Sequence, residues 1–337
     1  MGMRRLGSTG LEVSDFCLGA MMFGGMGNRD HAECERMIHT AIDAGINFID
    51  TADVYSRGES EEIVGGALKG RRDEVVLATK FWNTMGDEPN RRGGSRYWIM
   101  RAVEDSLRRL GTDHIDLYQM HRPDQYADIE ETLGALTDLV HQGKVRYIGS
   151  STFPAEGIVE AQWAAARRNS ERFVCEQPPY SIFVRGIERA VLPTCQKYGM
   201  GVIVWSPLNG GWLTGKYRRG QEVPAGSRGT MGRFVDPTDE QKLDAIEQLS
   251  KIADDAGVSL THMSLAWSIE HPAVTSAIIG PKTPDQLADL IAGTDVVLSA
   301  DVLDAIDSIV PFGVDLDPAN TATFNPGQSR KVRRRPR

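Results

Sequence analysis

The chain has 337 residues, with 38 lysines and arginines against 46 aspartates and glutamates, which gives a formal net charge of −8. Hydrophobic residues make up 41% of it and charged residues 25%, a composition that excludes disordered and fibrous classes and is typical of soluble globular proteins. An acidic protein is also poorly suited to nucleic acid as its main partner, because binding to phosphates needs a basic face. The length allows two ordinary domains or one barrel of alternating strands and helices.

The basic residues at the C-terminus are set apart from the rest. Residues 330–337 carry six basic side chains and no acidic one, so the other 329 residues hold 32 basic and 46 acidic side chains, a balance of −14. We interpret these eight residues as a basic, disordered tail behind a single domain over 1–329, with an anionic partner as the less favoured alternative.

Cysteine and hydropathy patterns argue against several kinds of site. The four cysteines, at 17, 34, 175 and 195, form no CxxC pair and no cluster with histidines, so neither a metal site nor a disulfide framework is expected. Reduced thiols fit a cytoplasmic location. No apolar run approaches about 18 residues and no secretory signal begins the chain, so we expect no membrane partner.

Short apolar runs alternate with amphipathic stretches along nearly the whole chain. A hairpin with its turn at residues 7–10 comes first. Eight strands are predicted at 16–20, 47–52, 74–80, 115–121, 145–151, 174–179, 201–208 and 276–280. Helical patterns lie between them at 32–45, 59–70, 95–111, 129–143, 155–168, 187–199 and over a longer region from 239 to 270, and one further helix follows residue 300.

Eight such repeats predict an α/β fold, a (β/α)8 TIM barrel with an N-terminal β-hairpin and a C-terminal extra helix and tail. Each parallel strand needs a helical crossover, and closure of the sheet removes both of its edges. A doubly wound open sheet is the competing arrangement, but no strand-to-helix turn carries GxGxxG. The insertion from 209 to 237 interrupts the repeat, and loops of this length are usually functional or mobile.

Four polar residues stand near the ends of three successive strands, where a barrel places its active site. They are Asp50, Tyr55, Lys80 and His121. A lysine after the apolar run 75–79 is a costly core residue unless it is paired, and Asp50 is the expected partner. The pair is expected to lower the pKa of Tyr55, and the imidazole of His121 would orient a carbonyl or share the proton.

Each of these residues also has a structural explanation when it is taken alone. Asp50 could cap a loop, Tyr55 could be an interfacial aromatic, Lys80 an ordinary charge at a strand end and His121 a core histidine. An acid, a phenol, an amine and an imidazole together make coincidence the weaker interpretation. The other six histidines have no carboxylates at metal-binding spacing, so no metal is expected.

At these residues the chain resembles the aldo-keto reductase superfamily, from about residue 3 to residue 310. The stretches that carry the resemblance are FIDTADVYSRGESEEIVG, VVLATK, SLRRLGTDHIDLYQMHRPD, GKVRYIGSST, CEQPPYS, VIVWSPLNGGWLTGKY and SAIIGPKTPDQL. EQPPY, WSPL and LTGKY are most similar to the branch that contains microbial reductases and potassium-channel β subunits. In this family the catalytic tetrad is Asp, Tyr, Lys and His, which corresponds here to Asp50, Tyr55, Lys80 and His121.

The resemblance implies an NAD(P)H-dependent aldo-keto reductase, in which NADPH reduces an aldehyde or ketone to the alcohol and Tyr55 delivers the proton. NADH stays an alternative cofactor, because Leu290 stands where the family usually has an adenine-binding Asn. The implied partner is a small carbonyl compound, and the oligomeric state is left open, a homo-oligomer included. The resemblance also implies an alternative, an NADPH-binding sensor module like the channel subunits. Those subunits have Asn in place of His121, which favours the reductase.

The resemblance further assigns residues to the cofactor and the substrate. Cofactor positions correspond to Met21, Asp50, Ser151, Thr152, Gln177, Trp205, Ser206, Pro207, Leu208, Gly210, Lys216, Arg228, Gly280, Lys282, Gln286 and Asp289. Among these, Trp205 would stack on the nicotinamide and Lys282 would meet the 2′-phosphate. Met21, Phe23, Trp82 and Phe324 could line an apolar substrate pocket, and Arg96, Arg122 and Asp124 could contact a sugar or a phosphate.

An unrelated barrel enzyme is a further alternative from the residues themselves. The amine of Lys80 could form a Schiff base with a carbonyl substrate, as in some isomerases and lyases.

Overall fold

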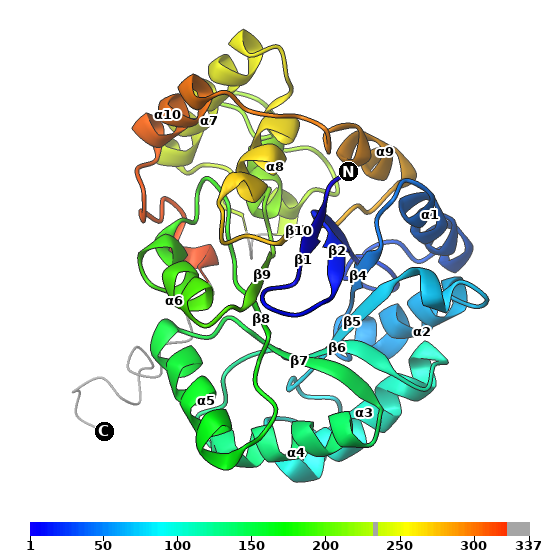
Figure 1. Cartoon of the computed structure of the whole chain (residues 1–337). Helices are drawn as coiled ribbons and strands as arrows, with labels where there is room; N and C mark the ends of the chain where they lie inside the picture. The colour runs from blue at the N-terminus through cyan, green and yellow to red at the C-terminus, as the bar shows by residue number, and fades with distance from the viewer. Residues whose placement is uncertain (232–234, 322–337) are drawn as a thin grey trace, which may run out of the picture.

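The computed structural model describes residues 1–231 and 235–321. Eight parallel strands close into a barrel in the order β10-β3-β4-β5-β6-β7-β8-β9, with the helices outside it (Figure 1). The strands are β3 (Phe16–Gly19), β4 (Phe48–Asp50), β5 (Val76–Phe81), β6 (Ile115–Met120), β7 (Val145–Ser151), β8 (Cys175–Gln177), β9 (Gly201–Val204) and β10 (Ser276–Ile279). The predicted (β/α)8 barrel is therefore confirmed. Phe324 and the predicted tail at 330–337 lie outside the described residues.

The helices follow the predicted order along the chain. They are α1 (His31–Asp43), α2 (Glu59–Ala67), α3 (Arg96–Leu110), α4 (Ile129–His141), α5 (Ala155–Arg168), α6 (Val191–Lys197), α7 (Glu240–Asp255), α8 (Leu260–Glu270), α9 (Pro284–Ala292) and α10 (Ala300–Ile309). Helices α7 and α10 pack against each other at one side of the barrel (Figure 1). They are additions to the eightfold repeat.

The helical region predicted from 239 to 270 divides into two helices. Helix α7 ends before Gly257, whose φ of +70° favours glycine. Helix α8 begins after Ser259, whose hydroxyl accepts a hydrogen bond from the backbone N–H of His262. A left-handed glycine followed by an N-cap serine thus ends one helix and starts the next.

The predicted N-terminal hairpin is present as β1 (Met3–Arg5) and β2 (Glu12–Ser14). It lies across the N-terminal end of the barrel strands (Figure 1). Its Leu6 and Val13 are fully buried among side chains of the barrel interior, Cys17 and Phe48 among them. The backbone N–H of Ser8 donates to the carbonyl of Gly199, just before β9. Because the hairpin covers the N-terminal end of the barrel interior, the interior opens toward the C-terminal end of the strands, where such barrels place their sites.

A substitution at Gly7, in the hairpin turn, tests whether the packing of the hairpin against the barrel stabilises the fold. Gly7 has a φ of +58°, and a Cβ there would overlap the carbonyl oxygen of Gly199 and the backbone nitrogen of Gly201. We expect Gly7→Ala to lower the free energy of unfolding by at least about 2 kcal/mol, measured by urea denaturation. Gly10→Ala in the same turn is the control, since its Cβ would meet nothing within 4 Å. Equal losses of stability in the two variants would mean that the close packing of the hairpin at Gly7 does not stabilise the fold.

Candidate active site

The four polar residues predicted from the strand ends lie together at the C-terminal end of the barrel. Asp50 is the last residue of β4, Lys80 lies in β5, and His121 directly follows β6. Tyr55 begins the 3-10 turn η1 (Tyr55–Gly58) that leads from β4 into α2. The rings of Tyr55 and His121 meet edge to face with their centroids 5.8 Å apart.

The Lys80 ammonium group is the centre of this cluster. It is fully buried, and its Nζ lies 2.5 Å from Asp50 Oδ1, 2.9 Å from the carbonyl oxygen of Thr51 and 3.4 Å from the Tyr55 hydroxyl. An ammonium group has three hydrogens to donate, so these three acceptors use all of them. The pKa of Lys80 is raised: burial acts to lower it, but Asp50 and Tyr55 outweigh burial. The lysine is therefore a fixed positive charge.

The second oxygen of Asp50 is held by two buried amides. Gln119 of β6 donates to Oδ2 at 3.0 Å and Gln177 of β8 donates at 2.9 Å. The Gln177 amide nitrogen also donates to Gln119 Oε1, at 3.1 Å. Sequence reasoning missed the role of Gln119, although a second polar side chain after Asp116, close to the predicted strand end at His121, is a signal that could have found it.

The pKa of Tyr55 differs from the expectation. It is raised above its usual value of 10.0, because burial of the phenol outweighs the opposing effect of Lys80. The lysine does act to lower the pKa, as expected, but the net direction is the opposite. The phenol consequently keeps its proton at neutral pH. Because its oxygen already accepts from Lys80, its own hydrogen is free to point toward another acceptor.

Asn83 orients the imidazole of His121, and sequence reasoning missed it. Its amide nitrogen lies 2.7 Å from His121 Nδ1. An amide nitrogen only donates, so Nδ1 accepts and the proton of the neutral ring lies on Nε2. Burial, together with the charges of Lys80 and Arg122, lowers the pKa of His121 well below its usual range. The histidine is thus a neutral hydrogen-bond donor beside the Tyr55 ring.

The residues assigned to the nicotinamide end of the cofactor follow the next strands of the barrel. Ser151 ends β7, Gln177 ends β8, and Trp205 follows β9 in a bridge with Pro179. The Ser151 hydroxyl donates to the Gln177 carbonyl at 2.9 Å. The predicted strand 201–208 is shorter than expected, since β9 ends at Val204 and Ser206 has a φ of +60°. This left-handed turn starts the loop that carries Pro207, Leu208 and Gly210.

Two basic residues of the long insertion lie close together without an acidic partner among the described residues. Lys216 and Arg228 are both half-buried, and burial is the main cause of the lowered pKa of each. The charge of Arg228 lowers the pKa of Lys216 further. Two adjacent cations with no counter-ion are suited to a polyanion such as a pyrophosphate group.

The residues assigned to the adenosine end lie around the start of α9. Gly280 follows β10, and the backbone N–H of Lys282 donates to Gln286 Oε1 at 2.8 Å. The Lys282 side chain makes no ion pair within the described part of the chain. Asp289 is directed elsewhere, since its carboxylate lies 3.1 Å from His262 Nε2 on α8. The structure thus brings Lys282 and Gln286 together, and it holds Asp289 against α8.

The three pocket residues differ in exposure. Met21 and Trp82 are half-buried in the loops after β3 and β5, and Trp82 has a φ of +115°. Phe23 has no exposed surface and packs in the apolar core, so it offers nothing for a ligand to contact. Arg96 pairs with Asp138 on the outer helices, and Asp124 accepts from the backbone of Gly94.

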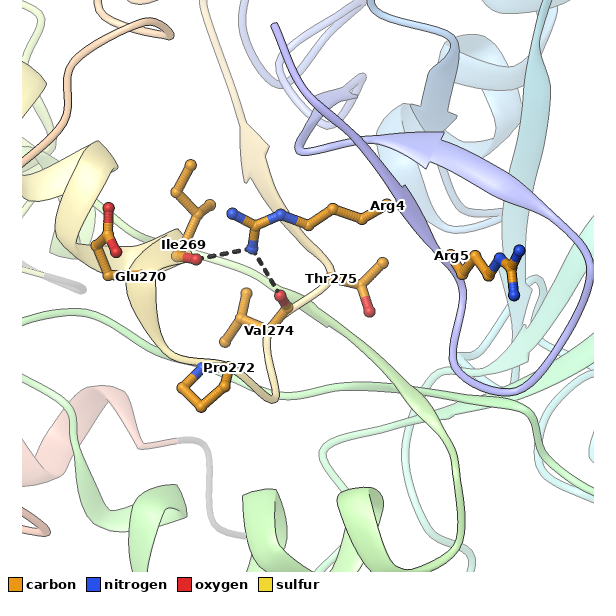
Figure 2. Close-up of a pocket in the computed structure, with 7 residues that line it drawn as sticks. All are labelled: Arg4, Arg5, Ile269, Glu270, Pro272, Val274 and Thr275. Atoms are coloured by element: carbon orange, nitrogen blue, oxygen red, sulfur yellow. Dashed lines mark hydrogen bonds between the residues drawn. The ribbon is translucent and has the colours of Figure 1, made fainter.

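A cavity of about 330 Å³ lies at the other end of the molecule (Figure 2). It is lined by Arg4 and Arg5 of β1 and by the chain that enters β10. Arg4 donates to the carbonyls of Ile269 and Val274, as the dashed lines in Figure 2 mark. The cavity adjoins the hairpin of β1 and β2 at the N-terminal end of the strands, and it is separate from the cluster around Lys80.

The structure was also searched for metal-binding clusters and for helices that could span a membrane. Within residues 1–231 and 235–321, no group of three or more histidine, cysteine, aspartate or glutamate side chains is arranged to hold a metal ion. In the same ranges, no helix has the length and apolar character needed to cross a membrane.

The sequence is similar to one protein family and to several known proteins. The sequence profile described as "Aldo/keto reductase family" matches residues 15–311. An "Uncharacterized oxidoreductase YrpG" of Bacillus subtilis is 40% identical over 317 residues, which cover 91% of this chain and 95% of that protein. A "Putative voltage-gated potassium channel subunit beta" of Schizosaccharomyces pombe is 37% identical over 92% of this chain and 93% of its own. An "Aldo-keto reductase YhdN" of Bacillus subtilis is 35% identical over 90% and 92%.

The buried pair of Lys80 and Asp50 can be tested through stability. Removing one partner leaves an uncompensated buried charge, so we expect Lys80→Met and Asp50→Asn each to lower the free energy of unfolding by about 3–5 kcal/mol. The double variant should be less destabilised than the worse single variant, because neither charge remains. Urea denaturation of all four proteins measures this coupling. Additive losses would mean that the two side chains stabilise the fold independently.

Proposed function

Because this chain belongs to the aldo/keto reductase family, we propose that it reduces aldehydes or ketones to alcohols with NADPH and uses Tyr55 as the proton donor. The observation that carries the proposal is the Lys80 ammonium group, held by Asp50 and Thr51 with its last hydrogen on the Tyr55 hydroxyl. A phenol fixed beside a buried cation can donate a proton and bear the charge that follows, since the cation stabilises the phenolate.

The hydrogen-bond directions support one arrangement of the substrate. The Tyr55 oxygen accepts from Lys80, so its hydrogen is available to a carbonyl oxygen. The proton of the neutral His121 ring lies on Nε2, because Asn83 donates to Nδ1. A carbonyl oxygen between these two donors would receive two hydrogen bonds as negative charge develops on it. Tyr55 would then pass its proton to that oxygen while Lys80 stabilises the remaining charge.

The residues fit an extended dinucleotide at the C-terminal end of the barrel. Lys216 and Arg228 would offer two half-buried cations to the pyrophosphate, and Trp205 an aromatic face to the nicotinamide. Ser151 and Gln177 would bind the carboxamide, and Lys282 the 2′-phosphate. When bound, the reduced nicotinamide supplies the hydride for the carbonyl carbon. We propose NADPH as the preferred cofactor, with NADH as the alternative.

A second candidate is an NADPH-binding regulatory module with slow turnover. It is favoured by the 36–37% identity to proteins named as potassium channel β subunits in Schizosaccharomyces pombe, rice and Arabidopsis thaliana. Incubation with NADPH and a broad panel of aldehydes separates the two candidates. Loss of NADPH absorbance that depends on the aldehyde supports the reductase, and its absence across the panel supports the sensor.

The geometry is poorly suited to Schiff-base chemistry on Lys80. That chemistry needs a neutral amine with a free lone pair, whereas this ammonium group has a raised pKa and three acceptors. Borohydride trapping with a carbonyl substrate should therefore leave Lys80 unmodified.

Replacement of Tyr55 tests the proton donor directly. We expect Tyr55→Phe to lower kcat/KM for 4-nitrobenzaldehyde by at least about 100-fold, because the general acid is lost while the ring remains. The loss of NADPH absorbance measures turnover, and quenching of tryptophan fluorescence measures the Kd for NADPH, which should change by less than about fivefold. An unchanged kcat would remove Tyr55 from this role.

The proposed 2′-phosphate site is tested through the choice of cofactor. Lys282→Ala should raise the Kd for NADPH about 10-fold or more and change the Kd for NADH little, because only NADPH carries that phosphate. Lys251→Ala is the matched control, an exposed lysine on the outer helix α7. Equal effects of Lys282→Ala on both cofactors would mean that other residues hold the phosphate.

A further inference from the structure

Arg122 is a half-buried cation beside the proposed reaction centre. It directly follows His121, and its Nη1 donates to the His121 carbonyl at 2.6 Å and to the Thr152 hydroxyl at 3.1 Å. Its guanidinium carbon lies 6.0 Å from the centre of the Trp205 ring. Arg122 is also close enough to Tyr55 that its charge acts to lower the pKa of the phenol. This arginine thus lies between the tetrad and the residues that follow β7 and β9.

The arginine has no counter-ion among the described residues. Burial lowers the pKa of Arg122, and the two groups that act to raise it are Tyr55 and Glu176. Glu176 is a fully buried side chain of β8, and it forms no ion pair with Arg122. Glu176 is already satisfied, since it accepts from the Ser150 hydroxyl at 2.5 Å and from the backbone N–H of Phe153 at 3.0 Å. Burial also raises the pKa of Glu176 to about 7, which reduces its charge.

One edge of the Arg122 guanidinium is unused. Both hydrogen bonds come from Nη1, and Nε and Nη2 donate to no acceptor in residues 1–231 or 235–321. These two nitrogens form the side-on edge that binds a carboxylate with two parallel hydrogen bonds. The Nη1 contacts hold the group in place, so this edge is oriented before a ligand arrives.

The proposed cofactor site has other cations for its phosphates. Lys216 and Arg228 lie in the insertion after β9, and Lys282 follows β10. Arg122 instead follows β6, immediately after the histidine that would contact the carbonyl oxygen. Its position favours a charge on the substrate over a phosphate of the cofactor.

We propose that Arg122 binds a carboxylate group of the substrate and so selects aldehydes or ketones that carry a carboxylate over neutral ones. This inference rests on the proposed carbonyl reduction, since it names the substrate class of that same site. The half-buried Trp82 after β5 would supply apolar contact for the part of the molecule between the two groups.

A pair of substrates that differ only in charge tests the proposal. We compare 4-carboxybenzaldehyde with methyl 4-formylbenzoate and determine the ratio of their kcat/KM values in the wild-type chain and in Arg122→Gln. The ratio should fall about 10- to 100-fold in the variant, as expected for a charge-assisted bidentate contact. Arg122→Lys should recover part of the ratio, because it restores the charge without the paired geometry. Arg36→Gln is the control, because Arg36 is an exposed residue of α1 with no ion pair to the described residues.

Two results with these variants would overturn the proposal. The first is a ratio that Arg122→Gln leaves unchanged. The second is an equal loss with both aldehydes, accompanied by a rise in the Kd for NADPH, which would assign Arg122 to the cofactor.

Binding without turnover separates this inference from the proposed function. Calorimetry with benzoate and with methyl benzoate, each added to the protein with NADP+, should show tighter binding of benzoate that Arg122→Gln abolishes. If no aldehyde is reduced and this preference persists, the carbonyl reduction fails and the carboxylate site stands. If benzoate binds no better than its ester, the carboxylate site fails whatever the activity.

Discussion

The arrangement of this site depends on one buried ion pair, that of Lys80 with Asp50. A lysine inside a barrel is costly unless its charge is compensated and all its hydrogens are accepted. Here Asp50 supplies the charge, and the Thr51 carbonyl and the Tyr55 hydroxyl take the remaining hydrogens. The amides of Gln119 and Gln177 then satisfy the other carboxylate oxygen, which ties β4, β5, β6 and β8 together. Stability and the orientation of the phenol therefore have the same physical origin.

The distribution of charge around this pair explains how an acidic protein could bind an anionic ligand. The balance of −14 over the first 329 residues opposes an anion at long range, but salt screens such interactions beyond about 8–10 Å. At the C-terminal end of the barrel, the charge of Lys80 is neutralised by Asp50. Arg122, Lys216 and Arg228 have no ion-pair partner among the described residues. For a ligand bound there, these nearby half-buried cations would matter more than the net charge of the whole chain.

The sequence alone was enough for the barrel, because eight apolar runs separated by helical patterns fit few other folds, and the polar cluster around Lys80 followed from polar residues near strand ends. It was not enough for contacts set by loop geometry. The bond from Asn83 to His121 depends on how the chain turns at Trp82, and the free edge of Arg122 depends on Thr152. The predicted direction of the Tyr55 pKa shift was wrong, because the shift depends mainly on burial of the phenol, which no sequence motif encodes.

Backbone strain marks the same end of the barrel. Among residues 1–231 and 235–321, the non-glycine residues with positive φ are Ser56, Arg57, Trp82, Thr152, Asn169, Ser206 and Asn209, and all but Asn169 lie in loops after barrel strands. Glycine would remove the strain at these positions but would also remove the side chain. At Thr152 that would delete the hydroxyl that accepts a hydrogen bond from Arg122. At Thr152, the strained backbone therefore carries a side chain that contacts the site.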